Sequence, residues 1–293
     1  MRKITGIILL QLICGLAFSQ DELTAIRKDF DSMMQSTTYG KNDAVGKYYD
    51  IRGFKMYCEV YGEGEPLLII HGNGGSIDNF LKQIPYFSKK YKVIIADSRA
   101  QGKSIDNSDS LSYEMMADDY AALLSAMKVD SAYVIGWSDG GINGLLLAIR
   151  HPEKVKKLAV TGANLQPDTS AVYGEVINMV MPSYKMLKAK KAPLSDQEKA
   201  GLKLLNLLVA EPHIPLSDVH KIAAPTLVIG GDHDVIKEEH TMQIYKNIAK
   251  SYLWILPNSG HSTPIVYTNE FNTTVDHFFS TPYRVIKGSK RFF

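Results

Sequence analysis

The sequence predicts an α/β protein with a mostly parallel, doubly wound sheet, an antiparallel hairpin at its start and a helical insertion. Short apolar runs of strand length alternate with helix-length runs through most of the chain, which is typical of a parallel sheet covered by helices. The alternation lapses between residues 166 and 216, where helical runs follow one another without a strand candidate. A chain of 293 residues that is 45% hydrophobic and 22% charged suits one large domain with such an insertion.

The N-terminal segment predicts a secretory signal peptide over residues 1–19. Two basic residues precede an apolar run from Ile7 to Phe18, and the residues before position 20 suit a signal peptidase, so we expect cleavage after Ser19. The run is short for a permanent membrane span, and a lipid anchor at Cys14 is disfavoured because the bulky Ile13 precedes it. The mature protein is therefore expected to be exported, periplasmic or secreted in a bacterium, without an integral membrane span.

Charge and cysteine content exclude several classes of function. A net charge of +2 supplies no basic field for nucleic acid. Removal of the signal peptide leaves Cys58 as a lone cysteine, so the mature chain cannot form an intramolecular disulfide. The expected partner is a small-molecule substrate, and the sequence carries no signal for an oligomeric state.

Residues 20–46 are predicted to form an N-terminal arm, with a helix from Glu22 to Met34 followed by a loop. The core then begins with Lys47–Ile51 and Phe54–Tyr61, two runs rich in Tyr, Val and Ile that are joined by a tight turn. These runs predict an antiparallel hairpin at one edge of the sheet.

The first part of the core, residues 47–165, continues with the parallel strands. Continuous apolar runs predict strands that are buried on both faces, and the amphipathic runs between them predict the covering helices. The predicted elements are strand Leu67–Ile70, helix Ile77–Lys89, strand Val93–Ala96, helix Tyr113–Met127 with Ser112 as its N-cap, strand Ala132–Ile135, helix Ile142–Ile149 and strand Leu158–Thr161.

The helical insertion, residues 166–216, contains runs at Val172–Ala189 and Ser195–Val209 that are broken by prolines. Active sites of open α/β sheets lie at the carboxyl ends of the strands, so we expect the insertion to cap those ends. The core resumes over residues 217–280, and residues 281–293 form a basic C-terminal tail. The remaining predicted elements are strand Thr226–Ile229, helix Glu238–Ala249, strand Tyr252–Leu256 and helix Thr263–Phe279.

Ser138 is the candidate nucleophile. It lies between a strand and a helix in Gly136-Trp137-Ser138-Asp139-Gly140, with a glycine two residues away on each side. Larger residues there would collide across a sharp bend, and this arrangement, called a nucleophile elbow, pushes the serine hydroxyl out above the sheet edge. The helix that follows supplies free N–H groups and a dipole that favour negative charge beside that oxygen.

A serine nucleophile needs a base and a group that orients the base. The carboxylate-rich loop after one predicted strand contains Asp232 and Asp234, and His261 lies in the loop after the next strand. Because these strands are parallel, their loops meet at one edge of the sheet. The chain order Ser138, Asp234, His261 matches one known order of serine, acid and histidine in such triads.

These motifs, in this order, resemble the α/β-hydrolase superfamily, in particular its cap-bearing esterases, lactonases and carbon–carbon hydrolases, over roughly Tyr48 to Phe279. His71-Gly72-Asn73-Gly74-Gly75 resembles the H-G-x-x-G turn of the family. The run DSRAQGKS at residues 97–104 resembles the D-x-R-G-x-G-x-S loop, with Ala100 in place of the first glycine. The resemblance implies an oxyanion hole made by the backbone N–H groups of Asn73 and Asp139.

The resemblance also implies the roles of the triad. His261 would take the Ser138 proton and later return one to the leaving group, while a carboxylate holds the imidazole in the correct tautomer. Asp234 is preferred as that carboxylate because the acid of the family stands at the second aspartate of such a G-D-x-D turn. Asp232 is the second choice, and Asp168, after the preceding strand, is the third.

Other side chains near these motifs have weaker assignments. Trp137, beside the nucleophile, and His71, in the oxyanion turn, are possible substrate-binding residues, although His71 is expected mainly to shape its turn. The run from Asp232 to His240 holds carboxylates and histidines but has no recognisable zinc pattern. No metal and no cofactor are expected.

The sequence therefore predicts a cofactor-free serine hydrolase that cleaves an ester or related acyl bond of a small, fairly apolar molecule. Lactone opening or carbon–carbon bond cleavage with the same triad is an alternative, because the cap decides between these reactions. A non-catalytic ligand-binding or receptor module on the same fold is an alternative of another class. A dehalogenase is disfavoured, because that branch needs a carboxylate where Ser138 stands.

Overall fold

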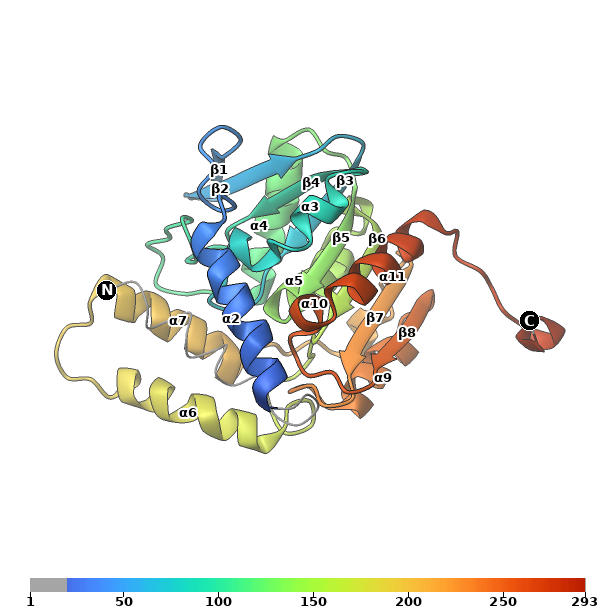
Figure 1. The fold of residues 1–293 in the computed structure, drawn as a ribbon. Helices are drawn as coiled ribbons and strands as arrows, with labels where there is room; N and C mark the ends of the chain where they lie inside the picture. Colours follow the sequence, from blue (N-terminus) through green and yellow to red (C-terminus); the bar gives the residue numbers. More distant parts are fainter. Residues whose placement is uncertain (1–19, 293) are drawn as a thin grey trace.

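The computed structural model describes residues 20–292, which fold around one eight-stranded sheet (Figure 1). The spatial order is β1-β2-β4-β3-β5-β6-β7-β8; β2 pairs antiparallel with β1 and β4, and the other neighbours are parallel. This confirms the predicted doubly wound sheet with an antiparallel start. The strands are β1 (Lys47–Ile51), β2 (Phe54–Tyr61), β3 (Glu65–Ile70), β4 (Tyr91–Ala96), β5 (Ala132–Trp137), β6 (Val155–Thr161), β7 (Thr226–Gly231) and β8 (Ser251–Leu256).

Helices cover both faces of the sheet, and one helical pair lies beyond its edge (Figure 1). The α-helices are α2 (Gln20–Ser36), α3 (Ile84–Phe87), α4 (Tyr113–Ala126), α5 (Asp139–Arg150), α6 (Gly174–Lys188), α7 (Asp196–Ala210), α8 (Leu216–Val219), α9 (Glu238–Asn247), α10 (Thr263–Val266) and α11 (Thr268–Ser280). Short 3₁₀ helices are η1 (Ile77–Phe80), η2 (Pro152–Lys154) and η3 (Gly288–Phe292).

Strand β3 illustrates how the two faces are filled. Its Leu68 and Ile70 pack into the core under α4 and α5, whereas Leu67 and Ile69 pack into the core under α3 and α11. Successive strand residues point to opposite faces, and each fully buried Leu or Ile contributes about 1.5–3 kcal/mol. An uninterrupted apolar run is therefore what a strand covered on both faces requires.

The helix predicted over Ile77–Lys89 is wrong in its extent. The structure has the 3₁₀ helix η1 and then the separate short helix α3. Pro85 has no N–H to donate, and its ring disfavours a helical conformation of the preceding residue. A helix therefore restarts with Pro85 in its first turn, which is the position that tolerates proline.

Two other helix boundaries differ from the sequence prediction. The final helix predicted over Thr263–Phe279 is divided into α10 and α11 at Tyr267, whose ψ of 47° is not helical. By contrast, α6 continues through Pro182, so this proline does not break the first run of the insertion.

The helical insertion leaves the sheet after β6 and returns to it at β7. Helices α6 and α7 run side by side as a pair (Figure 1). Helix α7 turns one face towards the core, where Gly201, Leu204 and Leu207 are buried, whereas no residue of α6 is buried. The insertion is therefore anchored through α7.

The loop that follows helix α2 is anchored on Glu59, a buried residue of β2. The Glu59 carboxylate accepts hydrogen bonds from the backbone N–H groups of Gly40 at 2.8 Å and Asn42 at 3.0 Å. It also accepts from the hydroxyls of Tyr57 and Tyr61, each at 2.8 Å. Four donors converge on one carboxylate, so this contact fixes the end of the N-terminal arm to the sheet.

Replacing Glu59 by glutamine is expected to lower the free energy of unfolding by about 2–4 kcal/mol. The amide nitrogen cannot accept a hydrogen bond, so donors on that side of the side chain would lose their partner while they stay buried. Urea unfolding measures the loss. Glu63→Gln, in the exposed turn after β2, is the matched control and should change stability by less than about 0.5 kcal/mol. Equal stability of the two variants would contradict the anchoring role.

No helix within residues 20–292 is both long enough and apolar enough to cross a membrane. The predicted signal peptide, residues 1–19, and its Cys14 lie outside the described residues.

Candidate active site

Ser138 occupies a sharp turn between β5 and α5. Its φ of 58° lies in the left-handed region, which costs about 1–3 kcal/mol for a residue other than glycine. A Cβ on Gly136 would overlap the carbonyl oxygen of Gly140, and one on Gly140 would overlap that of Ile70. The turn therefore requires glycine at both positions, and it has the geometry of the predicted elbow.

The structure brings Ser138, His261 and Asp234 together at the carboxyl ends of β5, β8 and β7. His261 Nε2 lies 2.8 Å from the Ser138 Oγ, and His261 Nδ1 lies 2.6 Å from Asp234 Oδ1. Asp234 and His261 are both buried. A hydrogen-bonded chain thus runs from a buried carboxylate through an imidazole to a serine hydroxyl, which is the arrangement that activates a nucleophile.

The three candidate acids occupy different positions. Asp234 also accepts the N–H of Ile236 at 3.2 Å, which orients its carboxylate. Asp232 accepts the N–H of Ser259 at 3.1 Å and so ties together the two loops that carry the acid and the histidine. Asp168 accepts a backbone N–H of its own turn at 2.8 Å. Of the three, the structure brings Asp234 to the imidazole.

Two contacts hold His261 in place. The Trp137 indole donates its Nε1–H to the main-chain carbonyl of His261 at 2.8 Å. Gly162, the residue after β6, lies against the ring, and a Cβ on this glycine would be 2.6 Å from His261 Cε1 and 2.7 Å from Nδ1. Gly162 also has a φ of 63°, so both its conformation and its surroundings require glycine.

The loop after β3 lies directly against the nucleophile. A Cβ on Gly72 would be 3.1 Å from the Ser138 Cβ. Asn73 follows in this loop, and Asp139 is the first residue of α5, a position where the backbone N–H has no acceptor within the helix. The two residues assigned to the oxyanion hole therefore lie on segments that meet at Ser138.

Asp139 carries a buried carboxyl group next to the nucleophile. Asn73 Nδ2 donates to its Oδ2 at 2.8 Å, and the Tyr113 hydroxyl forms a second hydrogen bond to it. Burial raises the pKa of the Asp139 carboxyl to about 6, and the two hydrogen bonds oppose this rise. The net charge beside the nucleophile therefore changes within the range of pH in which many hydrolases work.

Comparison with known proteins agrees with the fold. Residues 65–202 match the family model described as alpha/beta hydrolase fold. The crystal structure of the enol-lactonase from Burkholderia xenovorans LB400 has a TM-score of 0.69 to this chain at 19% identity, and covers 80% of this chain and 100% of that one. The chain has the α/β-hydrolase fold, and residues 65–202 are similar to this family.

Curated relatives give the same class of enzyme. Serine hydrolase BPHL of Homo sapiens is 25% identical over 244 residues, which span 78% of this chain and 84% of that protein. The 2-hydroxy-6-oxo-6-phenylhexa-2,4-dienoate hydrolase of Comamonas testosteroni is 26% identical over 261 residues, which span 76% of this chain and 90% of that protein. The chain is accordingly a hydrolase.

Both ring nitrogens of His71 form hydrogen bonds to the protein backbone. Its Nε2 accepts the N–H of Ser98 at 2.9 Å, and its Nδ1 lies 2.8 Å from the carbonyl oxygen of Gly72, so Nδ1 carries the proton. Burial lowers the pKa of His71 to about 4. His71 thus shapes the turn after β3, and Trp137 supports His261. A substrate-binding role for either residue stays a prediction.

The run from Asp232 to His240 does not converge on one point. Asp234 faces His261, whereas His240 Nε2 accepts the N–H of Leu165 at 2.9 Å. Within residues 20–292, no group of three or more His, Cys, Asp or Glu side chains could hold a metal ion.

His240 is expected to make stability depend on pH. Burial lowers its pKa from 6.5 to about 4, so the folded state disfavours the imidazolium. The unfolded chain binds the proton more tightly, and stability is therefore present above pH 6.5 and lost as the pH falls towards 4. Between pH 6.5 and 4, the free energy of unfolding of His240→Gln is expected to fall by roughly 3 kcal/mol less than that of the wild type.

Urea unfolding at several pH values measures this difference. His71 acts in the same direction, and the raised pKa values of Asp97 and Asp139 act in the opposite direction, so variant and wild type are compared at each pH. His220→Gln, at an exposed position, is the control and should keep the wild-type slope. A His240→Gln slope equal to that of the wild type would contradict the assignment.

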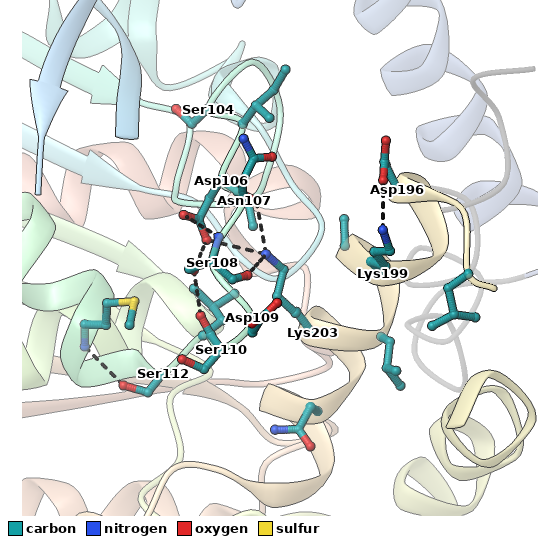
Figure 2. A pocket seen from close by; sticks show the side chains of 18 of the residues that line it. Ser104, Asp106, Asn107, Ser108, Asp109, Ser110, Ser112, Asp196, Lys199 and Lys203 are labelled. Atoms are coloured by element: carbon teal, nitrogen blue, oxygen red, sulfur yellow. Dashed lines mark hydrogen bonds and ion pairs between the residues drawn. The ribbon is translucent and has the colours of Figure 1, made fainter. Parts of the chain in front are cut away.

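A cavity of about 1020 Å³ lies between the loop 104–112 and the helical insertion (Figure 2). In Figure 2 the Lys203 ammonium reaches this loop and donates to the carbonyl oxygens of Asp106 at 3.1 Å and Ser108 at 2.8 Å. Within the described part of the chain, the residues that line this cavity do not include Ser138, Asp234 or His261. It is therefore separate from the hydrogen-bonded triad.

Three contributors to the site were not identified from the sequence. These are Gly162 against the imidazole, the Asn73 side chain on Asp139, and the Tyr113 hydroxyl on the same carboxyl. Gly162 had a detectable signal, because it directly follows a predicted strand at the sheet edge where the triad assembles. The two contacts to Asp139 depend on packing between distant segments and had no such signal.

Proposed function

We propose that this protein is a cofactor-free serine hydrolase that cleaves an ester or related acyl bond through Ser138, His261 and Asp234. The observation that carries the proposal is the hydrogen-bonded chain from Asp234 Oδ1 through both ring nitrogens of His261 to Ser138 Oγ. The start of α5 beside Ser138 adds the electrostatic environment that favours an oxyanion.

The first half of the reaction acylates the enzyme. His261 carries a proton on Nδ1 and uses this N–H to donate a hydrogen bond to the Asp234 carboxylate. Its Nε2 is therefore free to take the proton of the Ser138 hydroxyl. The Ser138 Oγ then bonds to the acyl carbon, and the carbonyl oxygen becomes an oxyanion. The N–H groups of Asn73 and Asp139 stabilise it. When the intermediate collapses, His261 gives its proton to the leaving alcohol.

The second half repeats these steps with water. His261 takes a proton from a water molecule, the hydroxide adds to the acyl carbon, and collapse returns the proton to the Ser138 Oγ. Asp234 keeps its charge throughout and stabilises the imidazolium that forms twice per turnover. The products are a carboxylic acid and an alcohol, and atoms balance without a cofactor.

The helical insertion is proposed to cap the site and to select a small, fairly apolar substrate. Support comes from α7, which reaches the oxyanion loop, because the Leu204 carbonyl accepts a hydrogen bond from Asn73 at 3.1 Å. The neighbouring helix α6 is rich in flexible thioethers, with Met179 and Met186 exposed. Such side chains adapt to apolar ligands of different shape.

Fluorophosphonate labelling tests the proposal. The wild type should form a covalent adduct at Ser138, found by peptide mass spectrometry, and should hydrolyse short p-nitrophenyl esters. Ser138→Ala should do neither. A wild type that neither labels nor turns over any acyl substrate would refute the proposal. If it nevertheless binds a small ligand tightly, and Ser138→Ala binds equally, the chain is instead a binding module on this fold.

Lactone opening or carbon–carbon bond cleavage is the second candidate reaction. Its support is that the similar proteins include an enol-lactonase and a 2-hydroxy-6-oxo-6-phenylhexa-2,4-dienoate hydrolase. The same triad serves both chemistries, so a panel of esters, lactones and vinylogous diketones assayed side by side decides. The substrate with the highest kcat/KM identifies the reaction.

Export is proposed on the basis of the N-terminal sequence. Expression of the full chain in a bacterium, followed by N-terminal sequencing of the product outside the cytoplasm, tests it. The expected mature N-terminus is Gln20. A product that stays in the cytoplasm with an intact N-terminus would refute the proposal, and a lipid on Cys14 would replace it with an anchored form.

A further inference from the structure

The Asn73 side chain joins three segments that are far apart in the sequence. Asn73 is 7% exposed, and both hydrogens of its Nδ2 are used. One goes to Asp139 Oδ2 at 2.8 Å, beside the nucleophile, and the other to the carbonyl oxygen of Leu204 at 3.1 Å, in α7. One buried amide therefore links the oxyanion loop to the nucleophile helix and to the helical insertion.

The α7 end of this link is firmly held. The Leu204 side chain is buried in the core together with Leu207 one turn later. The neighbouring Lys203 donates to Asp106 and Ser108 of the loop 104–112 (Figure 2). An amide bonded to such a helix has little freedom, so it can hold the loop to which it belongs.

A second connection joins α7 to the same carboxyl group. Glu211, which directly follows α7, accepts the N–H of Tyr113 at 3.2 Å. The Tyr113 hydroxyl in turn forms a hydrogen bond to Asp139. The middle and the end of α7 thus both reach Asp139, once through Asn73 and once through Tyr113.

We propose that Asn73 is a positioning residue, whose side chain sets the oxyanion hole by tying its loop to Asp139 and to α7. The backbone N–H of Asn73 must point at the position that the oxyanion takes, and small displacements of such a donor are costly. The side chain fixes this backbone from both sides. The packing of α7 on the core therefore controls where the Asn73 N–H points relative to Ser138.

This inference rests on the proposed function and deepens it. It assigns to the insertion a part in transition-state stabilisation besides shaping the substrate pocket. A residue that acts only in the transition state lowers kcat and leaves KM nearly unchanged when it is removed, whereas a pocket residue changes KM. The two roles are therefore separable by kinetics.

The test uses Asn73→Leu, which keeps the volume of the side chain and removes both donors. We expect kcat for a p-nitrophenyl ester, and the second-order rate of Ser138 labelling by a fluorophosphonate, to fall at least about tenfold. KM should change by less than about twofold. Tyr113→Phe removes only the hydroxyl of the second connection, and its kcat should fall by roughly threefold.

Asn272→Leu is the matched control. Asn272 is also a buried amide; it lies in α11, and its side chain bonds Gln83 and the carbonyl oxygen of Lys82. Its replacement should lower the melting temperature as Asn73→Leu does, while kcat and the labelling rate stay at the wild-type values. If Asn73→Leu does not fold, Asn73→Ser, which keeps one donor, takes its place with the same expected direction.

Three outcomes are distinguishable. A wild type that labels, with an Asn73 variant that labels and turns over at the wild-type rate, overturns the positioning role and leaves the proposed function intact. A variant in which KM rises and kcat is unchanged also overturns it, because Asn73 would then act on substrate binding. A wild type that does not label at all refutes the proposed function first, and the inference with it.

Discussion

Replacing Asp234 by asparagine is expected to lower kcat for an ester substrate by a factor of about 10⁴. An asparagine can present its amide to His261 Nδ1 and stabilise the tautomer whose proton is on Nε2, which cannot accept the proton of Ser138. It also removes the charge that stabilises the imidazolium. KM should change little, because Asp234 is buried behind the histidine.

Asp232→Asn is the matched comparison for Asp234→Asn. Asp232 lies two residues away and bonds the backbone of the histidine loop, so its replacement loosens that loop without touching the imidazole. We expect a loss of less than about tenfold in kcat. Loss of turnover in Asp232→Asn alone, with Asp234→Asn active, would reverse the assignment of the acid.

Replacing Gly162 by alanine is expected to reduce kcat/KM at least about 100-fold. The new Cβ would lie 2.6 Å from His261 Cε1, so the ring must move away from its hydrogen bonds to Ser138 and Asp234. The left-handed φ of 63° adds about 1–2 kcal/mol of strain. Ester hydrolysis and thermal unfolding of the purified variant measure the two effects.

Gly53→Ala separates the displacement of the ring from the backbone strain. Gly53 has a φ of 91°, and no atom lies within 4 Å of the position that a Cβ would take, so alanine there carries strain without a collision. This variant should lose stability and keep its specific activity. Equal activity of the two variants would show that His261 tolerates the Gly162 methyl and would contradict the prediction.

The parallel strands β3 to β7 were predictable because most of their residues are buried against helices on both faces of the sheet, whereas the edge strand β8 is only half-buried. A run such as Leu67–Ile70 must then be apolar throughout, and few other local structures need this pattern. The helix expected over Ile77–Lys89 failed because its apolar spacing persists across Pro85, while the backbone chemistry of proline divides it. Hydrophobic spacing reports which residues are buried, and it does not report where the hydrogen-bonded turns stop.

The convergence of Ser138, Asp234 and His261 could be predicted because they lie in the turns and loops that follow parallel strands. Ser138, Asp234 and His261 meet for the same topological reason, whatever the details of packing. The contacts of Asn73 with Asp139 and Leu204 have no such rule behind them. These contacts depend on how the helical insertion packs against the core, and local sequence patterns do not report such packing between distant segments.

Strand β8, which precedes His261, is an outer strand of the sheet, and on the proposed function the enzyme cannot act until β8 has paired. Ser138 precedes His261 by 123 residues, and His261 follows β8, the last strand in the chain order. A nascent chain that ends before β8 lacks His261, and on the proposed function it could not activate Ser138. On the proposed function, hydrolysis recovers after dilution from denaturant only in molecules in which β8 has paired with β7, so recovered activity reports this pairing without a spectroscopic probe.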